Sequence, residues 1–241
     1  FGPGWSWGDH LYDIWGSSST DVYAVGKWEV ILHFDGEGWS QMPLAGDPEP
    51  EDDFLSVWGT GPENVLVAGD GEIWHFGGDA WTQMETAPGY YRGLWGSSPA
   101  DIYAAGDRDP ELLHFDGGGW SPVPGVNGPF HNLWGTPEGE YFGVGRGDLL
   151  WHFNGTSWTQ TPSPSEDSLV AIGGSSATDV YASGYEGAVV HYDGTAWTEL
   201  LPTTFSLQDV WGASGEDVVA VGTRGRILRT TGFGWEEMET P

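Results

Sequence analysis

The chain contains six copies of one sequence unit, and this repeat constrains the fold more than any other feature. In the first copy the unit reads WGSS at residues 15–18, DVYAVG at 21–26, HFDG at 33–36 and a tryptophan at 39. The leading positions of the six copies are Trp15, Trp58, Trp95, Trp134, Gly173 and Trp211. These positions are 43, 37, 39, 39 and 38 residues apart, a period that is typical of four-stranded propeller blades.

Four short segments of each unit have the composition of β strands. In the first copy they are residues 11–15, 21–25, 30–34 and 39–42, which we name strands a, b, c and d. Their valine, isoleucine and aromatic side chains favour pleated, packed surfaces, and Gly-Ser and Asp-Gly pairs between them indicate turns. No segment has a sustained helical period, so we expect almost no helix. The sequence therefore predicts an all-β fold, a six-bladed β-propeller of four-stranded antiparallel blades, in which radially arranged sheets cover each other's faces.

The length of 241 residues suits a single β domain. The predicted blades span approximately residues 10–44, 54–85, 90–124, 130–161, 168–201 and 206–239. Residues 1–8 contain Gly4-Trp5-Ser6, which repeats Gly38-Trp39-Ser40. We interpret them as an extra strand that either closes the ring against the last blade or is the remnant of a preceding repeat.

Two connections of the unit vary in length and two do not. The distance from the leading position to the glycine that ends strand b is 11 residues in every copy, as from Trp15 to Gly26, and strand c is always 6 residues before the next tryptophan, as from His33 to Trp39. The b–c loops and the d–a connections vary. Consecutive antiparallel strands place these two variable connections at the same end of every sheet, so they should form one face of the protein. Variable loops on a rigid scaffold commonly carry specific function.

The candidate ligand-binding residues lie on this face. They are Lys27, Trp28, Tyr90, Tyr91, Arg92, Arg108, His131, Arg146, Tyr185, Arg224 and Arg226. Five of the seven basic residues of the chain are in or beside b–c loops. Aromatic rings beside arginine and acids can hold a sugar or a peptide by stacking and charge-assisted hydrogen bonds. The alternative is that long charged side chains simply favour loops, since acids are present there as well.

The charge of the chain limits its partners. Acids outnumber bases 36 to 7, giving a formal charge of −29, so nucleic acid is not an expected partner. The excess of acids fits an exported protein or one that attracts cations. We expect a monomer that is extracellular or on the cell surface. No apolar run reaches the roughly 18 residues of a membrane span. The absence of cysteine excludes disulfides and thiolate metal sites. Because the chain starts at Phe1, we interpret it as a processed segment whose targeting cannot be read.

Repeated histidines and tryptophans have both a structural and a functional interpretation. Five histidines occupy the same strand-c position: His33, His75, His114, His152 and His191. We expect each to make the same hydrogen bond in its own blade, because the blade spacing separates them too far for a shared metal. The repeated tryptophans are expected to be scaffold, packed between sheets. The alternative is a multivalent lectin with one stacking site per blade cleft, in which Gly173 would weaken a site or open a cavity.

An acidic run follows the first blade. It consists of Asp47, Glu49, Glu51, Asp52 and Asp53. Calcium prefers such oxygen donors, but the run lacks the spacing of a calcium loop, so we expect a solvated loop and no cofactor, with calcium as the alternative.

Catalytic motifs are not evident. The sequence has no G-x-S-x-G elbow and no H-E-x-x-H, and nothing selects one acid pair for hydrolysis. We therefore expect a non-catalytic recognition propeller that binds a glycan or a protein through the b–c and d–a loops. A sialidase-like or calcium-dependent glycan-active enzyme is the alternative.

The repeated motifs W-G-S-S-x-x-D-V-Y-A-V-G and I-L-H-F-D-G-x-x-W resemble propeller repeats of secreted and surface proteins of bacteria, over residues 10–239. They are also distantly similar to the Asp-box repeats of sialidases and photosystem assembly factors, but the turn at residues 35–39 is one residue shorter and lacks the serine. Sialidases hold a carboxylate with three arginines, a role in which Arg92, Arg146 and Arg224 can be imagined although the resemblance does not map them. Fold alone assigns no activity.

Overall fold

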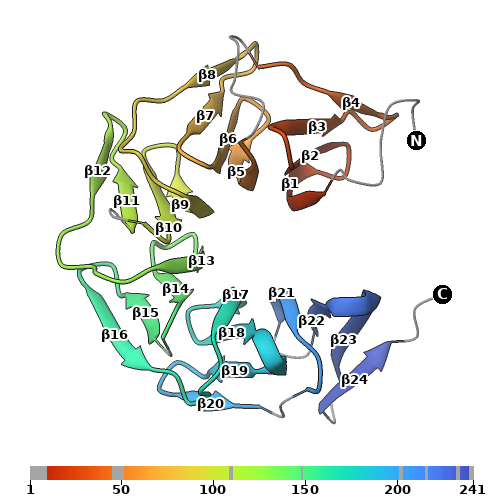
Figure 1. Cartoon of the computed structure of the whole chain (residues 1–241), viewed down its shortest axis with the longest axis vertical. Helices are drawn as coiled ribbons and strands as arrows, with labels where there is room; N and C mark the ends of the chain where they lie inside the picture. The colour runs from red at the N-terminus through yellow and green to blue at the C-terminus, as the bar shows by residue number, and fades with distance from the viewer. Residues whose placement is uncertain are drawn as a thin grey trace. The chain divides into compact units, whose positions relative to one another are not determined.

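A computed structural model describes residues 10–44, 52–108, 111–147, 149–200, 203–214, 217–231 and 234–238. The chain forms two compact units, Phe1–Gly125 and Val126–Pro241, which are described separately below. Each unit holds three four-stranded sheets, and their strands are labelled in Figure 1. The segment expected to close the ring, residues 1–8, lies outside the described residues.

Unit 1 contains blades 1 to 3. Blade 1 comprises β1 (Leu11–Ser18), β2 (Asp21–Gly26), β3 (Val30–Phe34) and β4 (Trp39–Gln41). Blade 2 comprises β5 (Phe54–Gly61), β6 (Asn64–Gly69), β7 (Ile73–Phe76) and β8 (Trp81–Gln83). Blade 3 comprises β9 (Tyr91–Ser98), β10 (Asp101–Gly106), β11 (Leu112–Phe115) and β12 (Trp120–Pro122).

Unit 2 contains blades 4 to 6. Blade 4 comprises β13 (Phe130–Gly135), β14 (Tyr141–Gly145), β15 (Leu149–Phe153) and β16 (Trp158–Pro162). Blade 5 comprises β17 (Leu169–Ser176), β18 (Asp179–Gly184), β19 (Val189–Tyr192) and β20 (Trp197–Glu199). Blade 6 comprises β21 (Leu207–Ser214), β22 (Asp217–Gly222), β23 (Arg226–Thr231) and β24 (Gly234–Met238).

Every blade pairs its strands in chain order, and every pairing is antiparallel. The predicted a, b, c and d strands are therefore confirmed, although strand a continues beyond the leading tryptophan, from Trp15 to Ser18 in blade 1. Helix is limited to two 3-10 turns among the described residues, Tyr185–Gly187 and Thr223–Gly225. No helix in the described part of the chain has the length and apolar character needed to cross a membrane.

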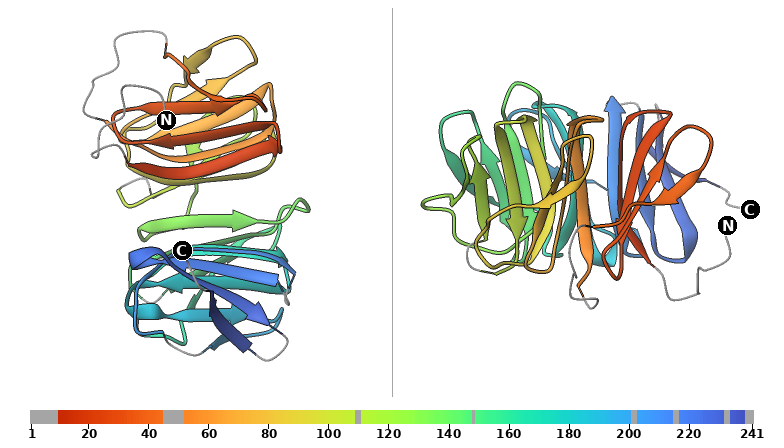
Figure 2. Two further views of the ribbon diagram at one scale, coloured as in Figure 1. Left: turned by 90° about the vertical axis from the view of Figure 1, so that its right-hand side faces the viewer. Right: turned by 90° about the horizontal axis from the view of Figure 1, so that it is seen from above.

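The sheets of each unit stack face to face, as the left view of Figure 2 shows for the strands of unit 1. Valine, isoleucine and aromatic side chains fill the spaces between neighbouring sheets, and Val25, Ile31 and Val65 in the space between blades 1 and 2 have no exposed surface. Burial of such side chains is the main stabilising contribution to a β fold of this kind.

The Trp-Gly pair of the repeat connects successive blades. A Cβ at Gly59 would lie 2.8 Å from the ring of Trp15, and a Cβ at Gly96 would lie 2.8 Å from the ring of Trp58. The leading tryptophan of one blade thus lies on the glycine that follows the leading position of the next blade, which explains why the motif needs both residues. The predicted scaffold role is confirmed for these tryptophans.

Among the repeated tryptophans of the described residues, the two with the largest exposed surfaces are in the first and the last blade. Trp39 in blade 1 is 50% exposed and Trp211 in blade 6 is 61% exposed. By contrast, Trp81 in blade 2 is 2% exposed because Met42 and Leu44 of blade 1 pack against the core that contains it. A repeated tryptophan is therefore covered when a neighbouring blade of the same unit lies against it.

The backbone approaches closely at the position where glycine replaces the leading tryptophan. A Cβ at Gly173 would lie 2.6 Å from the carbonyl oxygen of Val210 in the next blade. The backbone of β21 therefore occupies the space directly beside the Cα of Gly173.

Candidate functional site

The b–c loops and the d–a connections lie at the same end of each sheet, as the antiparallel order requires. In blade 1 the Lys27 amide donates to the carbonyl of His10, and in blade 2 the Asp70 amide donates to the carbonyl of Asp53, at 2.8 and 3.2 Å. In blade 5 the Tyr185 amide donates to the carbonyl of Ser168 at 3.1 Å. In these blades the b–c loop is thus fastened to the segment that leads into strand a.

The glycine that ends strand b makes this attachment possible. An added Cβ would lie 2.0 Å from the His10 carbonyl oxygen at Gly26 and 1.8 Å from the Asp53 carbonyl oxygen at Gly69. Only a residue without a side chain permits such an approach. The constant spacing of 11 residues from the leading position to this glycine therefore marks where the end of strand b contacts the backbone of the segment before strand a.

A cluster of arginine and tyrosine lies at this end of blade 3. Two guanidinium groups lie over the ring of Tyr90, with Arg92 Cζ 4.6 Å and Arg108 Cζ 5.1 Å from its centroid. Arg92 donates through Nε to Asp107 at 3.2 Å, and Arg108 Nη1 lies 3.8 Å from Asp70. Arg108 is 65% exposed in its side chain, so much of its hydrogen-bonding capacity faces solvent.

A second cluster lies at the same end of blade 1. Lys27 Nζ lies 4.5 Å from the ring centroid of Trp28, which is 47% exposed. Trp28 has a left-handed backbone, with φ of 62°, and its amide donates to the carboxylate of Asp53 at 3.0 Å. Left-handed φ is uncommon and costly for a bulky residue, and such strain occurs often at binding sites.

Tyr12 connects the two clusters. Its hydroxyl donates to Asp53 at 3.2 Å, and its side chain is 46% exposed. Its pKa is raised by partial burial first, then by the Asp53 carboxylate, with a smaller contribution from Tyr90. The Asp53 carboxylate also accepts from the Trp28 amide, and its carbonyl accepts from the amide of Asp70, whose carboxylate lies 3.8 Å from Arg108. The two clusters are therefore adjacent through Asp53. We name the surface formed by Tyr12, Lys27, Trp28, Tyr90, Arg92 and Arg108 the arginine–aromatic surface.

Sequence reasoning missed Tyr12, although a signal was available. In the register of the repeat, Tyr12 occupies the same strand-a position as Arg92 and His131, which were both candidates. Aligning strand a across the copies would have included it.

Tyr91 does not belong to this surface. Its side chain has no exposed surface, and its hydroxyl donates to the carbonyl of Ala87. Burial raises its pKa to about 12. The prediction that Tyr91 contacts a ligand is corrected, because strand alternation turns Tyr91 into the core while it turns its neighbours Tyr90 and Arg92 outward.

The remaining candidates lie at the loop end of unit 2. His131 makes a hydrogen bond through Nδ1 to the carbonyl of Leu169 at 2.9 Å, and Arg146 is exposed. Tyr185, 49% exposed, and Arg224, with φ of 65°, lie in the two 3-10 turns.

Arg226 is held by a partner in its own blade. It makes two hydrogen bonds of 2.6 Å to Glu237 and lies 4.1 Å from the ring centroid of Phe205. Its guanidinium is thus already paired in the two-pronged geometry that a ligand carboxylate would use.

The repeated histidines lie toward the opposite end of the sheets and are structural. His33, His114 and His191 accept or donate a hydrogen bond at Nε2 to the acid that opens strand b, at 2.7 to 2.9 Å. Each ring also stacks on the strand-b aromatic residue, as His33 does on Tyr23 at 4.5 Å. The prediction of one repeated hydrogen bond per blade is confirmed.

Two copies change the chemistry of this bond. In blade 2 the partner of His75 is Asn64, at 2.8 Å, and burial lowers the pKa of His75. In blade 6 Arg229 replaces histidine and binds Asp217 at 2.9 Å. The same connection between strands b and c is therefore preserved with different groups.

Metal ligation has no geometric support in the part of the chain that the structure describes. Within it, no group of three histidine, aspartate or glutamate side chains is arranged to hold a metal ion. Most of the acidic run suggested as a calcium loop, including Asp47, Glu49 and Glu51, lies outside the described residues.

The fold is shared with known structures, although the sequence is not closely related to them. The structure of YCF48 bound to a D1 peptide is similar at a TM-score of 0.76 with 19% identity, covering 95% of this chain and 81% of that one. A streptogramin B lyase is similar at 0.79 with 12% identity, covering 96% and 84%. The WD40 repeats of RRP9 are similar at 0.77 with 10% identity, covering 93% and 77%.

This is a six-bladed all-β propeller. No protein-family model and no curated protein matches the sequence. The structural neighbours include a peptide-bound protein and a lyase, so the propeller fold by itself does not select between recognition and catalysis.

Proposed function

We propose that this propeller is a recognition module that binds a peptide segment of a protein partner through the arginine–aromatic surface. The observation that carries the proposal is the placement of positive charge in unit 1. The only basic residues of Phe1–Gly125 are Lys27, Arg92 and Arg108, and all three belong to this surface. In a chain with a formal charge of −29, all the lysine and arginine of unit 1 is thus concentrated at one end of its sheets.

The composition of the surface favours a protein partner over a glycan. Tryptophan, tyrosine and arginine are the residues that dominate binding energy at protein interfaces. Trp28 and Tyr12 present about half of their surfaces to solvent, and the guanidinium groups of Arg92 and Arg108 pack on the ring of Tyr90 and restrict its rotamers. Ordered side chains lose less conformational entropy on binding.

The charges suggest the chemistry of the peptide. Among the described residues, Arg92 pairs with Asp107 and Arg108 pairs with Asp70, and each guanidinium has further N–H donors for ligand carboxylates or backbone carbonyls. We therefore expect a peptide with one or two acidic residues beside an apolar residue that packs on Trp28. The similar structure with a bound D1 peptide supports peptide binding as a use of this fold. We also propose an extracellular or cell-surface setting, which the strong acidic excess supports.

Selection from a random peptide library on the immobilised protein tests this proposal. Peptides selected by the wild type should lose at least fivefold in affinity for Trp28→Ala and for Arg108→Ala, measured by calorimetry. Trp39→Ala is the matched control, because Trp39 is 50% exposed in the same blade but lies at the start of β4, away from the surface.

Two results would overturn the proposal. The first is that selected peptides bind all variants with equal affinity. The second is that no peptide is selected while a glycan array gives ligands whose binding depends on the same residues, which would establish a glycan partner instead. Turnover of fluorogenic glycosides would favour the enzyme alternative.

A further inference from the structure

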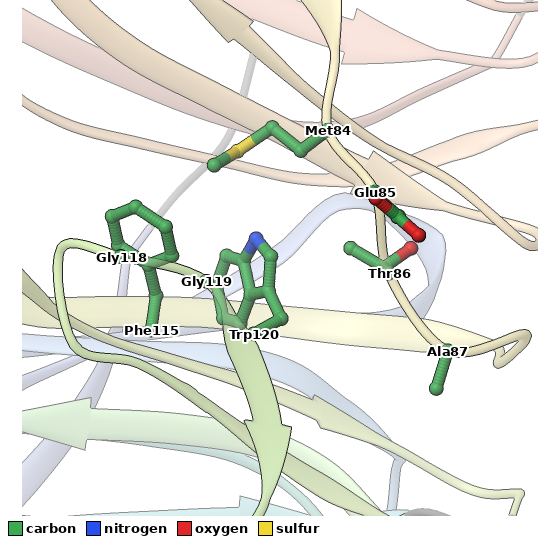
Figure 3. Close-up of a pocket in the computed structure, with 8 residues that line it drawn as sticks. All are labelled: Met84, Glu85, Thr86, Ala87, Phe115, Gly118, Gly119 and Trp120. Carbon is green, nitrogen blue, oxygen red and sulfur yellow. The ribbon is translucent and has the colours of Figure 1, made fainter.

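A pocket in unit 1 is separate from the arginine–aromatic surface. It has a volume of about 480 Å³ and lies between the segment that follows β8, residues 84–87, and the outer strands of blade 3, at Phe115 and residues 118–120. Figure 3 shows the ring of Trp120 between the side chains of Phe115 and Thr86, with Met84 above it. This volume is within the range of small-molecule sites.

The pocket results from local departures from the repeat. In the preceding cleft, Leu44 packs against the core cluster that contains Trp81, which is 2% exposed. The residue that corresponds to Leu44 is Thr86, because the amides of Met42 and Met84 make equivalent hydrogen bonds to strand c of their blades. The shorter threonine leaves the space open, and Trp120 remains partly exposed.

The turn between β11 and β12 enlarges the same space. Blade 3 has glycine at both positions before the strand-d tryptophan, Gly118 and Gly119, whereas every other copy has at least one side chain there. A Cβ at Gly119 would meet no atom within 4 Å. Backbone crowding therefore does not require this glycine, and Gly119 lines the pocket without a side chain.

The lining combines aromatic and acidic groups without a base. Phe115 and Trp120 form an aromatic pair with ring centroids 5.3 Å apart, and Met84 adds a polarisable thioether. Glu85 contributes an exposed carboxylate. Beside the pocket, the amides of Gly118 and Gly119 donate to Asp116 and lower the pKa of its carboxyl group, so that it stays ionised.

We propose that this pocket binds an organic cation, an ammonium group on an apolar stem, either free or as a lysine side chain of a peptide. The stem lies on Trp120 and Phe115, and the ammonium group binds Glu85 and faces the aromatic rings. The formal charge of −29 favours a cation over an anion at any such opening. A neutral sugar would also stack on Trp120, but its binding would depend much less on the charge of Glu85.

Titrations followed by the indole N–H signal of Trp120 in NMR spectra test the proposal, with the signal assigned by Trp120→Phe. The probes are choline for a free cation and N-acetyl-lysine N-methylamide for a side chain. N-acetyl-norleucine N-methylamide lacks only the charge, and cellobiose tests the sugar. At least one cation should bind at least fivefold more tightly than norleucine and cellobiose, and the better of the two cations shows which source the pocket favours.

Variants then separate charge from space. Glu85→Gln should weaken cation binding about tenfold, whereas Glu37→Gln, which removes an equal charge from the turn between β3 and β4 of blade 1, should change it less than twofold. Thr86→Leu combined with Gly119→Ala should abolish binding by filling the pocket, and Gly38→Ala is the control because a Cβ at Gly38 also meets no atom within 4 Å.

Three outcomes would overturn the inference. They are equal binding of the lysine and norleucine probes, cellobiose binding that Glu85→Gln leaves unchanged, and the absence of shifts with any probe at millimolar concentration. Arg92→Ala and Arg108→Ala should leave these titrations unaltered, so failure here is distinguishable from failure of the peptide-binding proposal.

Discussion

The closed loop end of each blade depends on the strand-b glycine, and Gly69→Ala tests this most directly. A Cβ at Gly69 would lie 1.8 Å from the Asp53 carbonyl oxygen, far inside any tolerated contact, so the segment before β5 must move. Overpacking of this kind costs about 1–3 kcal/mol, and the hydrogen bond from the Asp70 amide to the Asp53 carbonyl that would be lost contributes about 1 kcal/mol. The lower backbone entropy of unfolded alanine offsets roughly 0.4–1 kcal/mol of this.

We therefore expect Gly69→Ala to lower the free energy of unfolding by about 2–3 kcal/mol. Urea denaturation followed by tryptophan fluorescence should show a midpoint lower by about 1 M, given ordinary denaturant slopes. Gly61→Ala in the same blade is the control, since a Cβ there meets no atom within 4 Å, and it should remain within about 1 kcal/mol of wild type. If both variants unfold at the wild-type midpoint, the close backbone approach does not explain the glycine.

Three further predictions concern the scaffold. Asn64→Asp should raise the pKa of His75, measured by NMR titration, because a carboxylate would then face the imidazole as Asp21 faces His33. In the wild type burial lowers that pKa, so the stability that His75 contributes is present above pH ~6.5 and is lost as the pH falls. A His75 pKa that the substitution leaves unchanged would contradict this. Burial first, then the nearby Asp21, raises the pKa of Tyr23 to about 12. The stability that Tyr23 contributes is therefore present below pH ~10 and is lost as the pH rises toward 12. Tyr23→Phe should make the urea midpoint less dependent on pH in this window, and an equal dependence would refute the assignment. Gly173→Trp restores the repeat but should destabilise the protein, because even a Cβ there would lie 2.6 Å from the Val210 carbonyl oxygen; a higher melting temperature would contradict that reading.

The fold could be predicted from the sequence because the repeat reports backbone geometry. Six copies with a constant a–b spacing fix the antiparallel register, which pairs Trp15 with Tyr23 and Gly26 with Leu11. The loop end followed from the same register, since alternate hairpins of an antiparallel sheet point to opposite ends. The hydrogen bonds of the repeated histidines followed too, because an identical position in each blade has an identical neighbour in strand b.

The candidate site could be predicted only in part. The sequence identified Trp28, Tyr90, Arg92 and Arg108 by residue type and loop position, but it also included Tyr91, whose side chain points into the core. Which of Tyr90 and Tyr91 points inward depends on the residue at which β9 begins, and residue type alone does not reveal that start.

The amino-acid sequence by itself determined the six repeats, the order of their strands and the end of the sheets at which the loops gather, because these depend on local spacing and backbone register. Only the tertiary structure decided that Tyr12 binds Asp53 at one surface and that Thr86 and Gly119 line a pocket beside Trp120. Both depend on contacts between neighbouring blades. Residues about 30 to 80 positions apart meet there through packing, which the spacing within one repeat does not specify.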